Sequence, residues 1–230
     1  MFTTLRISVK LTVGVFFLML YMAGGLAAET KAKVISIKGT PKAILKQSIR
    51  VLKLGDEVKV GERLLTGEEE HLTLKLSTGH KIFVLASTTA TLSKLMDGEV
   101  ELDQKTGSIW SKIKPLGKEE SFQIRTPASV AGVRGTAFIS MVMDPETTNI
   151  CVCEGKVEVS SGGEKKVVEK GFGVMLSKGV RPPAPMANAG KIRSRRRMAR
   201  KKACMSCHWA GEGDTSRMNE ESSLIFQAKP

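Results

Sequence analysis

Residues of the kinds that build catalytic and metal sites are scarce in this chain. Its 230 residues include three histidines, His71, His80 and His208, and four cysteines. The histidines are far apart, and none lies in a local signature of a nucleophile with its base. We expect Glu68–Glu70 to be a solvated loop rather than a metal site. The sequence therefore predicts a protein that is not an enzyme, and it indicates no small-molecule substrate.

Long apolar runs are absent after residue 28. The one such run, Leu11–Ala23, follows a stretch that carries Arg6 and Lys10 and no acid, and Gly24–Ala28 supplies small residues. This order is typical of a secretory signal in residues 1–28. The run approaches the length of a membrane span, so an uncleaved anchor is the alternative. In both cases we expect the rest of the chain to be soluble and outside the cytoplasm, in the periplasm or exported further.

No long helical period separates the apolar residues between 29 and 180. Residues 71–76 alternate strictly, with Leu72, Leu74 and Leu76 on one face. Shorter alternations recur between glycine-containing breaks, at Ala43/Leu45, Ile82/Val84, Val100/Leu102, Ile109/Ile113, Phe122/Ile124, Ile150/Val152 and Val157/Val159. Short strands at this spacing predict an all-β domain over residues 29–180, a β-sandwich or a solenoid-like stack.

The segment 126–138 reads TPASVAGVRGTAF and resembles the signature of FecR-type domains. The matching residues are Thr126, Pro127, Val133, Arg134, Gly135, Thr136 and Phe138. Flanking motifs follow the family order, at 55–61, 65–67, 152–159 and 170–174, while Ser77–His80 departs from the usual Asp-Gly-Ser turn. The resemblance covers roughly residues 33–176, and it implies an extracytoplasmic β domain that binds or senses a partner.

Regulators of the FecR family also carry a cytoplasmic sigma-factor-binding domain and a receptor-contacting subdomain. Ten residues precede the apolar run here, and the stretch after residue 180 is short for the second subdomain. We therefore expect the β module without anti-sigma activity.

Structural roles are expected for the residues of the signature. Pro127 fixes the entry to a turn or edge, and Gly132 and Gly135 permit backbone geometry that other residues resist. Arg134 has several donors, and we expect it to bridge turns by pairing with Asp56 or Glu154.

Cys204–His208 reads CMSCH, the spacing that covalent haem attachment requires in an exported protein. Cys204 and Cys207 would form the thioethers, and His208 would be the proximal ligand of the iron. Met218 is the nearest downstream distal ligand, with His71, His80 or a partner's residue as rivals. A disulfide or dithiol and a zinc site remain the alternatives to haem c.

The other two cysteines, Cys151 and Cys153, are two residues apart in a strand-like run. They would share one face of that strand and are poorly placed to bond each other, so we expect a small apolar pair.

The tail carries most of the net charge of +13, because residues 171–230 hold 12 basic and four acidic residues. A Pro/Ala linker over residues 181–190 precedes the basic tail, 191–230, which contains Arg195, Arg196 and Arg197. Export argues against nucleic acid as the partner. We expect these arginines to contact an anionic membrane surface or an envelope protein, with a solvated linker as the alternative.

Two functions follow from these observations. The first is a non-enzymatic exported protein whose FecR-like domain binds an envelope partner while a haem-bearing tail senses redox state or transfers electrons. The second is a binding or scaffolding module without haem, whose tail cysteines form a disulfide.

Overall fold

The computed structural model describes residues 31–96 and 98–187. All 17 elements in these ranges are β-strands, which confirms the all-β prediction. None of the described segments is a helix long and apolar enough to cross a membrane.

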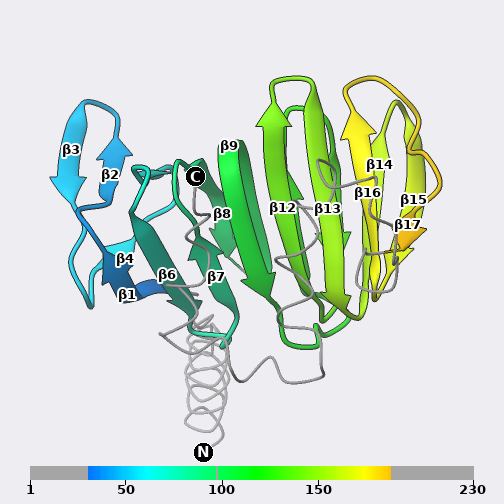
Figure 1. Cartoon of the computed structure of the whole chain (residues 1–230). Helices are drawn as coiled ribbons and strands as arrows, with labels where there is room; N and C mark the ends of the chain where they lie inside the picture. The colour runs from blue at the N-terminus through cyan, green and yellow to red at the C-terminus, as the bar shows by residue number, and fades with distance from the viewer. Residues whose placement is uncertain (1–30, 97, 188–230) are drawn as a thin grey trace, which may run out of the picture.

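The strands form two layers, which we call layer A and layer B (Figure 1). From edge to edge, layer A contains β4 (Glu57–Val58), β1 (Ala32–Lys38), β6 (His71–Leu76), β7 (Lys81–Val84), the second half of β9 (Glu99–Lys112), β12 (Ala137–Asp144), β13 (Thr147–Glu154), β16 (Phe172–Ser177) and β17 (Met186–Ala187). Layer B contains β3 (Ser48–Val51), β2 (Lys42–Leu45), β5 (Arg63–Leu65), β8 (Thr89–Met96), the first half of β9, β10 (Ser121–Arg125), β11 (Val130–Val133), β14 (Lys156–Ser161) and β15 (Glu164–Glu169). Neither layer closes on itself within the described residues.

The long strand β9 belongs to both layers and changes from one to the other near Gly107. Its first half pairs with β8 and β10, and its second half pairs with β7 and β12. Gly107 has a φ of +75°, and a Cβ there would lie 2.3 Å from Thr88 Oγ1. Only glycine fits this bend without moving the neighbouring strand.

After β9 the chain alternates between the layers one hairpin at a time. The hairpins β10–β11 and β14–β15 lie in layer B, and β12–β13 and β16–β17 lie in layer A. This order combines the sandwich and the solenoid-like stack that the sequence predicts. Strand β17 falls inside the stretch interpreted above as a linker, and it extends layer A beside β16.

One apolar core fills the space between the layers. Leu72, Leu74 and Leu76 are at most 1% exposed, so the alternation in residues 71–76 is confirmed. Layer B contributes residues such as Leu102 and Ile124 to the same core. Burial of these apolar side chains from both layers stabilises the sandwich, although each short strand would be unstable alone.

Candidate binding surfaces

The first half of the FecR-like signature forms the turn from β10 to β11. The Thr126 N–H donates to the carbonyl of Ser129 at 2.8 Å, and the Ser129 N–H donates to Thr126 Oγ1 at 3.1 Å. Thr148 Oγ1, from β13, donates to Thr126 Oγ1 at 2.9 Å. Thr126 therefore ties the turn that contains Pro127 to layer A.

The second half of the signature is the crossover from β11 to β12. Gly135 has a φ of +76°, and a Cβ there would lie 2.8 Å from Pro115 Cα, so the turn requires glycine. Thr136 Oγ1 donates to the carbonyl of Lys156 at 2.8 Å. Val133 and Phe138, on either side, are buried in the core. These residues hold the crossover in place.

Two expectations about this segment are wrong. Gly132 lies in β11, outside the positive-φ region, and a Cβ there would meet nothing closer than the Glu158 carbonyl at 3.9 Å. Arg134 is exposed and forms no ion pair with a carboxylate of the described residues. Asp56, which with Glu154 was one of its two expected partners, instead accepts a hydrogen bond from Arg50. Position 132 follows the ordinary strand path, and Arg134 points into solvent.

Arg50 is the centre of the most connected charged cluster among the described residues. Its guanidinium donates to both oxygens of Glu62, at 3.0 and 2.9 Å, and to Asp56 at 3.1 Å. It also donates to the Glu57 carbonyl at 2.7 Å. One side chain on β3 thereby fixes two turns, those at residues 53–56 and 59–62.

Glu62 is 3% exposed, which is unusual for a carboxylate. Burial by itself would raise its pKa, but the hydrogen bonds from Arg50 and from the Lys59 N–H outweigh burial and hold the pKa below its usual range. Glu62 is therefore charged and depends on Arg50 for its stability.

Strand β3 forms an edge of layer B and pairs only with β2 among the described strands. It carries two exposed apolar side chains, Ile49 and Val51. An open strand edge with exposed apolar side chains can bind a partner protein that adds one of its own strands to the sheet. This edge is the first candidate binding surface.

Glu70 differs from its neighbours in the acidic loop. Glu68 and Glu69 are exposed, as expected for a solvated loop. The Glu70 carboxylate instead accepts hydrogen bonds from the Thr40 N–H and hydroxyl at 2.9 and 3.0 Å, and from the Gly67 N–H at 2.8 Å. It joins the β1–β2 turn to the loop before β6.

A Glu70→Gln variant should lose about 1 kcal/mol of the free energy of unfolding, because a charged acceptor of three hydrogen bonds becomes neutral. The Gly67 N–H bond, followed by those from Thr40, holds the pKa of Glu70 below its usual value. A carboxyl whose pKa is lower in the folded than in the unfolded state stabilises the fold at pH values above the unfolded pKa. This stabilisation is lost as the pH falls through the folded pKa. Urea titrations at neutral and acidic pH should show the difference between Glu70→Gln and the parent shrinking in acid, whereas Glu68→Gln should match the parent at both.

The histidines considered as distal ligands occupy different environments. His80 is 4% exposed, and its Nδ1 accepts a hydrogen bond from the Lys114 N–H at 3.2 Å. Its ring meets Phe122 edge to face. Burial lowers the pKa of His80 and also that of His71, where Lys38 adds to the effect. Both are therefore neutral at pH 7, and His80 packs as part of the core.

Layer A has a second apolar surface on the side away from the core. We call it the Trp110 face; its members are Phe83, Leu85, Trp110, Ala137, Ile139, Met141, Cys151 and Cys153. Phe83 and Trp110 meet edge to face with ring centroids 4.8 Å apart. Cys151 and Cys153 lie together here, so the expected apolar pair on one side of a strand is confirmed.

The outward side of layer B has the opposite character. Glu101 on β9 pairs with Arg125 on β10, and Glu158 on β14 pairs with Lys165 on β15. These side chains face solvent, as in an ordinary sheet with one wet side. The two layers are therefore not equivalent, and among the described residues only layer A has a cluster of buried apolar side chains on its outward face.

The sequence motifs did not predict Arg50, Glu62 or the Trp110 face as parts of a site. The Trp110 face had a visible signal, because residues 137–139, 141–143 and 150–153 are apolar at consecutive rather than alternate positions. Such runs are typical of strands buried on both faces. The Arg50 cluster had no local signal, since it joins residues from separate turns.

The predicted tail sites lie outside the described residues. They are Cys204, Cys207, His208 and Met218, and the arginines Arg195, Arg196 and Arg197. Within residues 31–96 and 98–187, no group of three or more His, Cys, Asp or Glu side chains could hold a metal ion.

The architecture is that of an all-β protein with two layers that share one strand. Residues 62–158 match the family model described as FecR protein, which confirms over that range the resemblance read from the motifs. No curated protein matches the chain.

Among solved structures, the chain is similar to a candidate anti-sigma factor from Parabacteroides distasonis, in crystal structures at 1.65 and 2.50 Å resolution. In both cases the TM-score is 0.48 and the sequence identity 16%. The match covers 54% of this chain and 59% of the other, so this chain spans less than two thirds of that protein's length.

Proposed function

We propose that the chain is an exported, non-enzymatic module whose FecR-like sandwich binds a protein of the cell envelope. The observation that supports this best is the family match over residues 62–158, whose signature residues serve the fold rather than chemistry. The open edge at β3, with Ile49 and Val51 exposed, is the contact surface we assign to the partner. A signalling or regulatory role is consistent with such a module.

The second part of the proposal concerns the tail. Cys204 and Cys207 would hold one haem covalently, and His208 would bind its iron from one side. A bound haem would supply one-electron chemistry, so the tail would sense redox state or pass electrons to the partner. Met218 is the distal ligand we assign, because His80 is committed to the core by its bond with Lys114.

The test is to produce the chain in cells that carry a cytochrome c maturation system. A haem stain that survives denaturing electrophoresis, together with a Soret band of the purified chain, is the expected result. A colourless chain whose Cys204 and Cys207 are disulfide-bonded would favour the scaffold without haem and leave the β3 contact as the function.

The basic run adds a separate prediction about membrane contact. Replacing Arg195, Arg196 and Arg197 by Gln should weaken binding to anionic vesicles by about 1 kcal/mol for each charge near the surface. The effect should shrink as salt rises, because screening shortens the reach of the charges. Sedimentation with phosphatidylserine vesicles at low and high salt measures it. Equal binding at both salt concentrations would exclude the electrostatic contact.

A further inference from the structure

The Trp110 face continues across layer A as one register row. The paired residues along it, from β6 to β17, are Thr73, Phe83, Trp110, Ile139, Cys151, Gly173 and Met186. Successive residues in this row point to the same side of the sheet, opposite to the core. The row therefore defines the middle of the outward surface of layer A.

The centre of this surface is shielded although it faces outward. Trp110 is 2% exposed, Ile139 1% and Cys151 0%. Among the described residues, every apolar residue grouped with them comes from layer A or is the residue after β7. A single sheet cannot bury large side chains on its own outer side, so a further layer must cover them.

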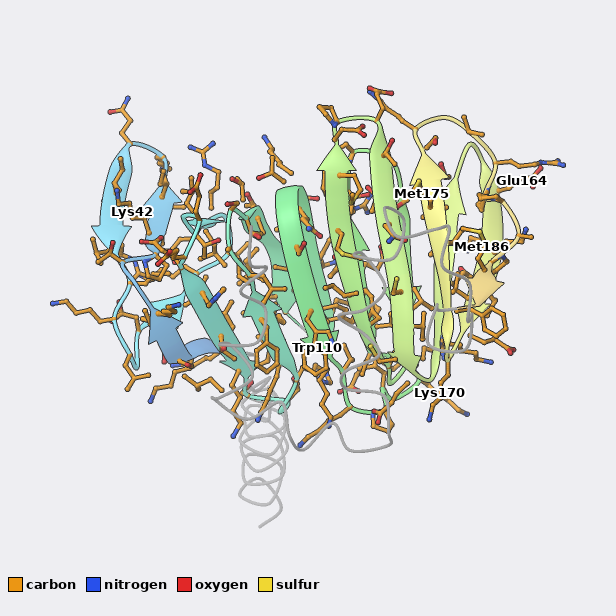
Figure 2. All side chains as sticks on the ribbon, in the orientation of Figure 1. Lys42, Trp110, Glu164, Lys170, Met175 and Met186 are labelled. Carbon is orange, nitrogen blue, oxygen red and sulfur yellow. The ribbon has the colours of Figure 1, made fainter. Side chains whose placement is uncertain are left out.

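The shielding stops toward the β17 edge. Met175 on β16 and Met186 on β17 are 43% and 61% exposed, and they lie away from Trp110 near that edge (Figure 2). The cover therefore lies over β7, β9, β12 and β13. The exposure of Met175 and Met186 shows that burial here is local and is not a property of the whole face.

Trp110 also has an unused polar group at the centre of the face. Its Nε1 is buried and has no hydrogen-bond partner among the described residues. A buried indole N–H usually finds an acceptor. A covering peptide would supply one through a backbone carbonyl.

The C-terminal segment, residues 188–230, starts at the edge of this surface. It follows β17, whose Met186 pairs with Gly173 in the same register row as Trp110. Four strand spacings, about 19 Å, separate β17 from β9. The 36 residues between β17 and Leu224 span up to about 120 Å when extended, so they reach the centre easily.

The end of the segment matches the chemistry of the face. Leu224–Phe226 is the only run of three large apolar residues in residues 188–230, and Glu220 and Glu221 precede it. Beside the apolar row, the same side of the sheet carries a register row of lysines, Lys75, Lys81 and Lys112. The acidic pair of the segment is therefore complementary in charge to the lysine row, and its apolar triplet is complementary to the apolar row beside it.

We propose that residues 188–230 fold back over layer A and dock on the Trp110 face. Leu224–Phe226 covers the apolar row, and Glu220 and Glu221 lie toward the lysine row. Docking places the Cys204–His208 segment against the sandwich rather than on a freely moving linker. The inference does not depend on haem attachment, because it uses only the face and the last residues of the tail.

The test follows the fluorescence of Trp110 in the full mature chain. The chain has two tryptophans, so Trp209→Phe leaves Trp110 as the only one. In this background, produced without haem and kept reduced, the triple variant Leu224→Asp, Ile225→Asp and Phe226→Asp should increase quenching by acrylamide severalfold and shift the emission to the red. Circular dichroism and urea midpoints verify that the sandwich stays folded.

The matched control is Ser222→Asp, Ser223→Asp and Gln227→Asp in the same background. It adds the same charge to the same segment without removing an apolar side chain, and quenching should stay at the parent level. A specific protease site inserted between Ala187 and Asn188 gives a second route. Cleavage after folding, followed by removal of the released peptide, should expose Trp110, and adding the peptide back should shield it again.

Three results would overturn the proposal. Trp110 that stays shielded in a monomer after the tail is cut and removed would mean that another segment, such as one before residue 31, covers the face. Shielding that depends on protein concentration, with light scattering showing a dimer, would mean that a second copy covers it. Equal exposure in both triple variants would mean that charge rather than apolar contact controls the tail.

Discussion

An Arg50→Ala variant is expected to lose about 3 kcal/mol of its free energy of unfolding. Glu62 is 3% exposed, and its main support is the pair of hydrogen bonds from Arg50. Removal of Arg50 would leave a buried carboxylate without its counter-charge. We take the lower end of the range for breaking a buried pair because the side chain of Arg50 is 36% exposed. Urea unfolding followed by circular dichroism measures the loss.

The stability lost in Arg50→Ala should depend on pH. The pKa of Glu62 lies below its usual range in the folded parent, so the pair stabilises the fold above the unfolded pKa and loses that effect as the pH falls through the folded pKa. Without Arg50, burial is the dominant influence and raises the pKa of Glu62. As the pH falls, the difference between the parent and Arg50→Ala should therefore begin to narrow at the raised pKa of Glu62 in the variant and should keep narrowing down to the lowered pKa in the parent.

Lys165→Ala is the matched control, because it breaks the exposed pair between Lys165 and Glu158, whose atoms are 2.8 Å apart. It should cost at most about 1 kcal/mol. The double variant Arg50→Ala and Glu62→Gln should recover part of the stability lost in Arg50→Ala, because no buried charge remains. An Arg50→Ala variant no less stable than Lys165→Ala would show that the cluster does not hold the turns.

A Cys207→Ala variant is expected to lose one of the two thioether bonds and to retain far less covalent haem than the parent. With one thiol of the CMSCH segment missing, the two thioether bonds that the spacing permits cannot both form. The haem stain after denaturing electrophoresis of chains made with the maturation system measures the loss. Cys153→Ala removes a thiol that lies in the Trp110 face and should keep the stain at the parent level. Stain that persists when Cys204 and Cys207 are both replaced would place any haem elsewhere.

Much of the fold could be predicted because its strands are local patterns. Leu72, Leu74 and Leu76 alternate in the sequence and face the core, and a short glycine-containing turn separates them from Ile82 and Val84. Such patterns depend on the two-residue period of a strand, which any sequence shows directly. They identify which face is buried, and they do not identify the neighbouring strand.

The sharing of β9 between the layers could not be predicted in this way. Nothing in residues 99–112 indicates that the first half pairs with β8 and β10 and the second half with β7 and β12. These pairings join residues far apart in the chain, and they depend on packing of the whole sandwich. Gly107 suggested only a break, whereas it is the bend at which the strand changes layer.

Charged contacts were the least predictable part of the candidate sites. Arg134 belongs to the signature and was expected to pair with Asp56 or Glu154, but Arg50 reaches Asp56 and Glu62 together from β3. Arg50 lies in no recognised motif. An ion pair depends on positions that only the folded backbone supplies. An arginine in a motif is therefore no more certain to form an ion pair than an arginine outside one.

The most direct test of an exported module with a haem-bearing tail is the intact mass of the mature chain after co-expression with the maturation system. The expected mass is that of the chain cleaved near residue 28 plus one haem, retained under denaturing conditions. A chain without haem that is lighter than its reduced form by two hydrogens would contradict haem attachment and show a disulfide in its place.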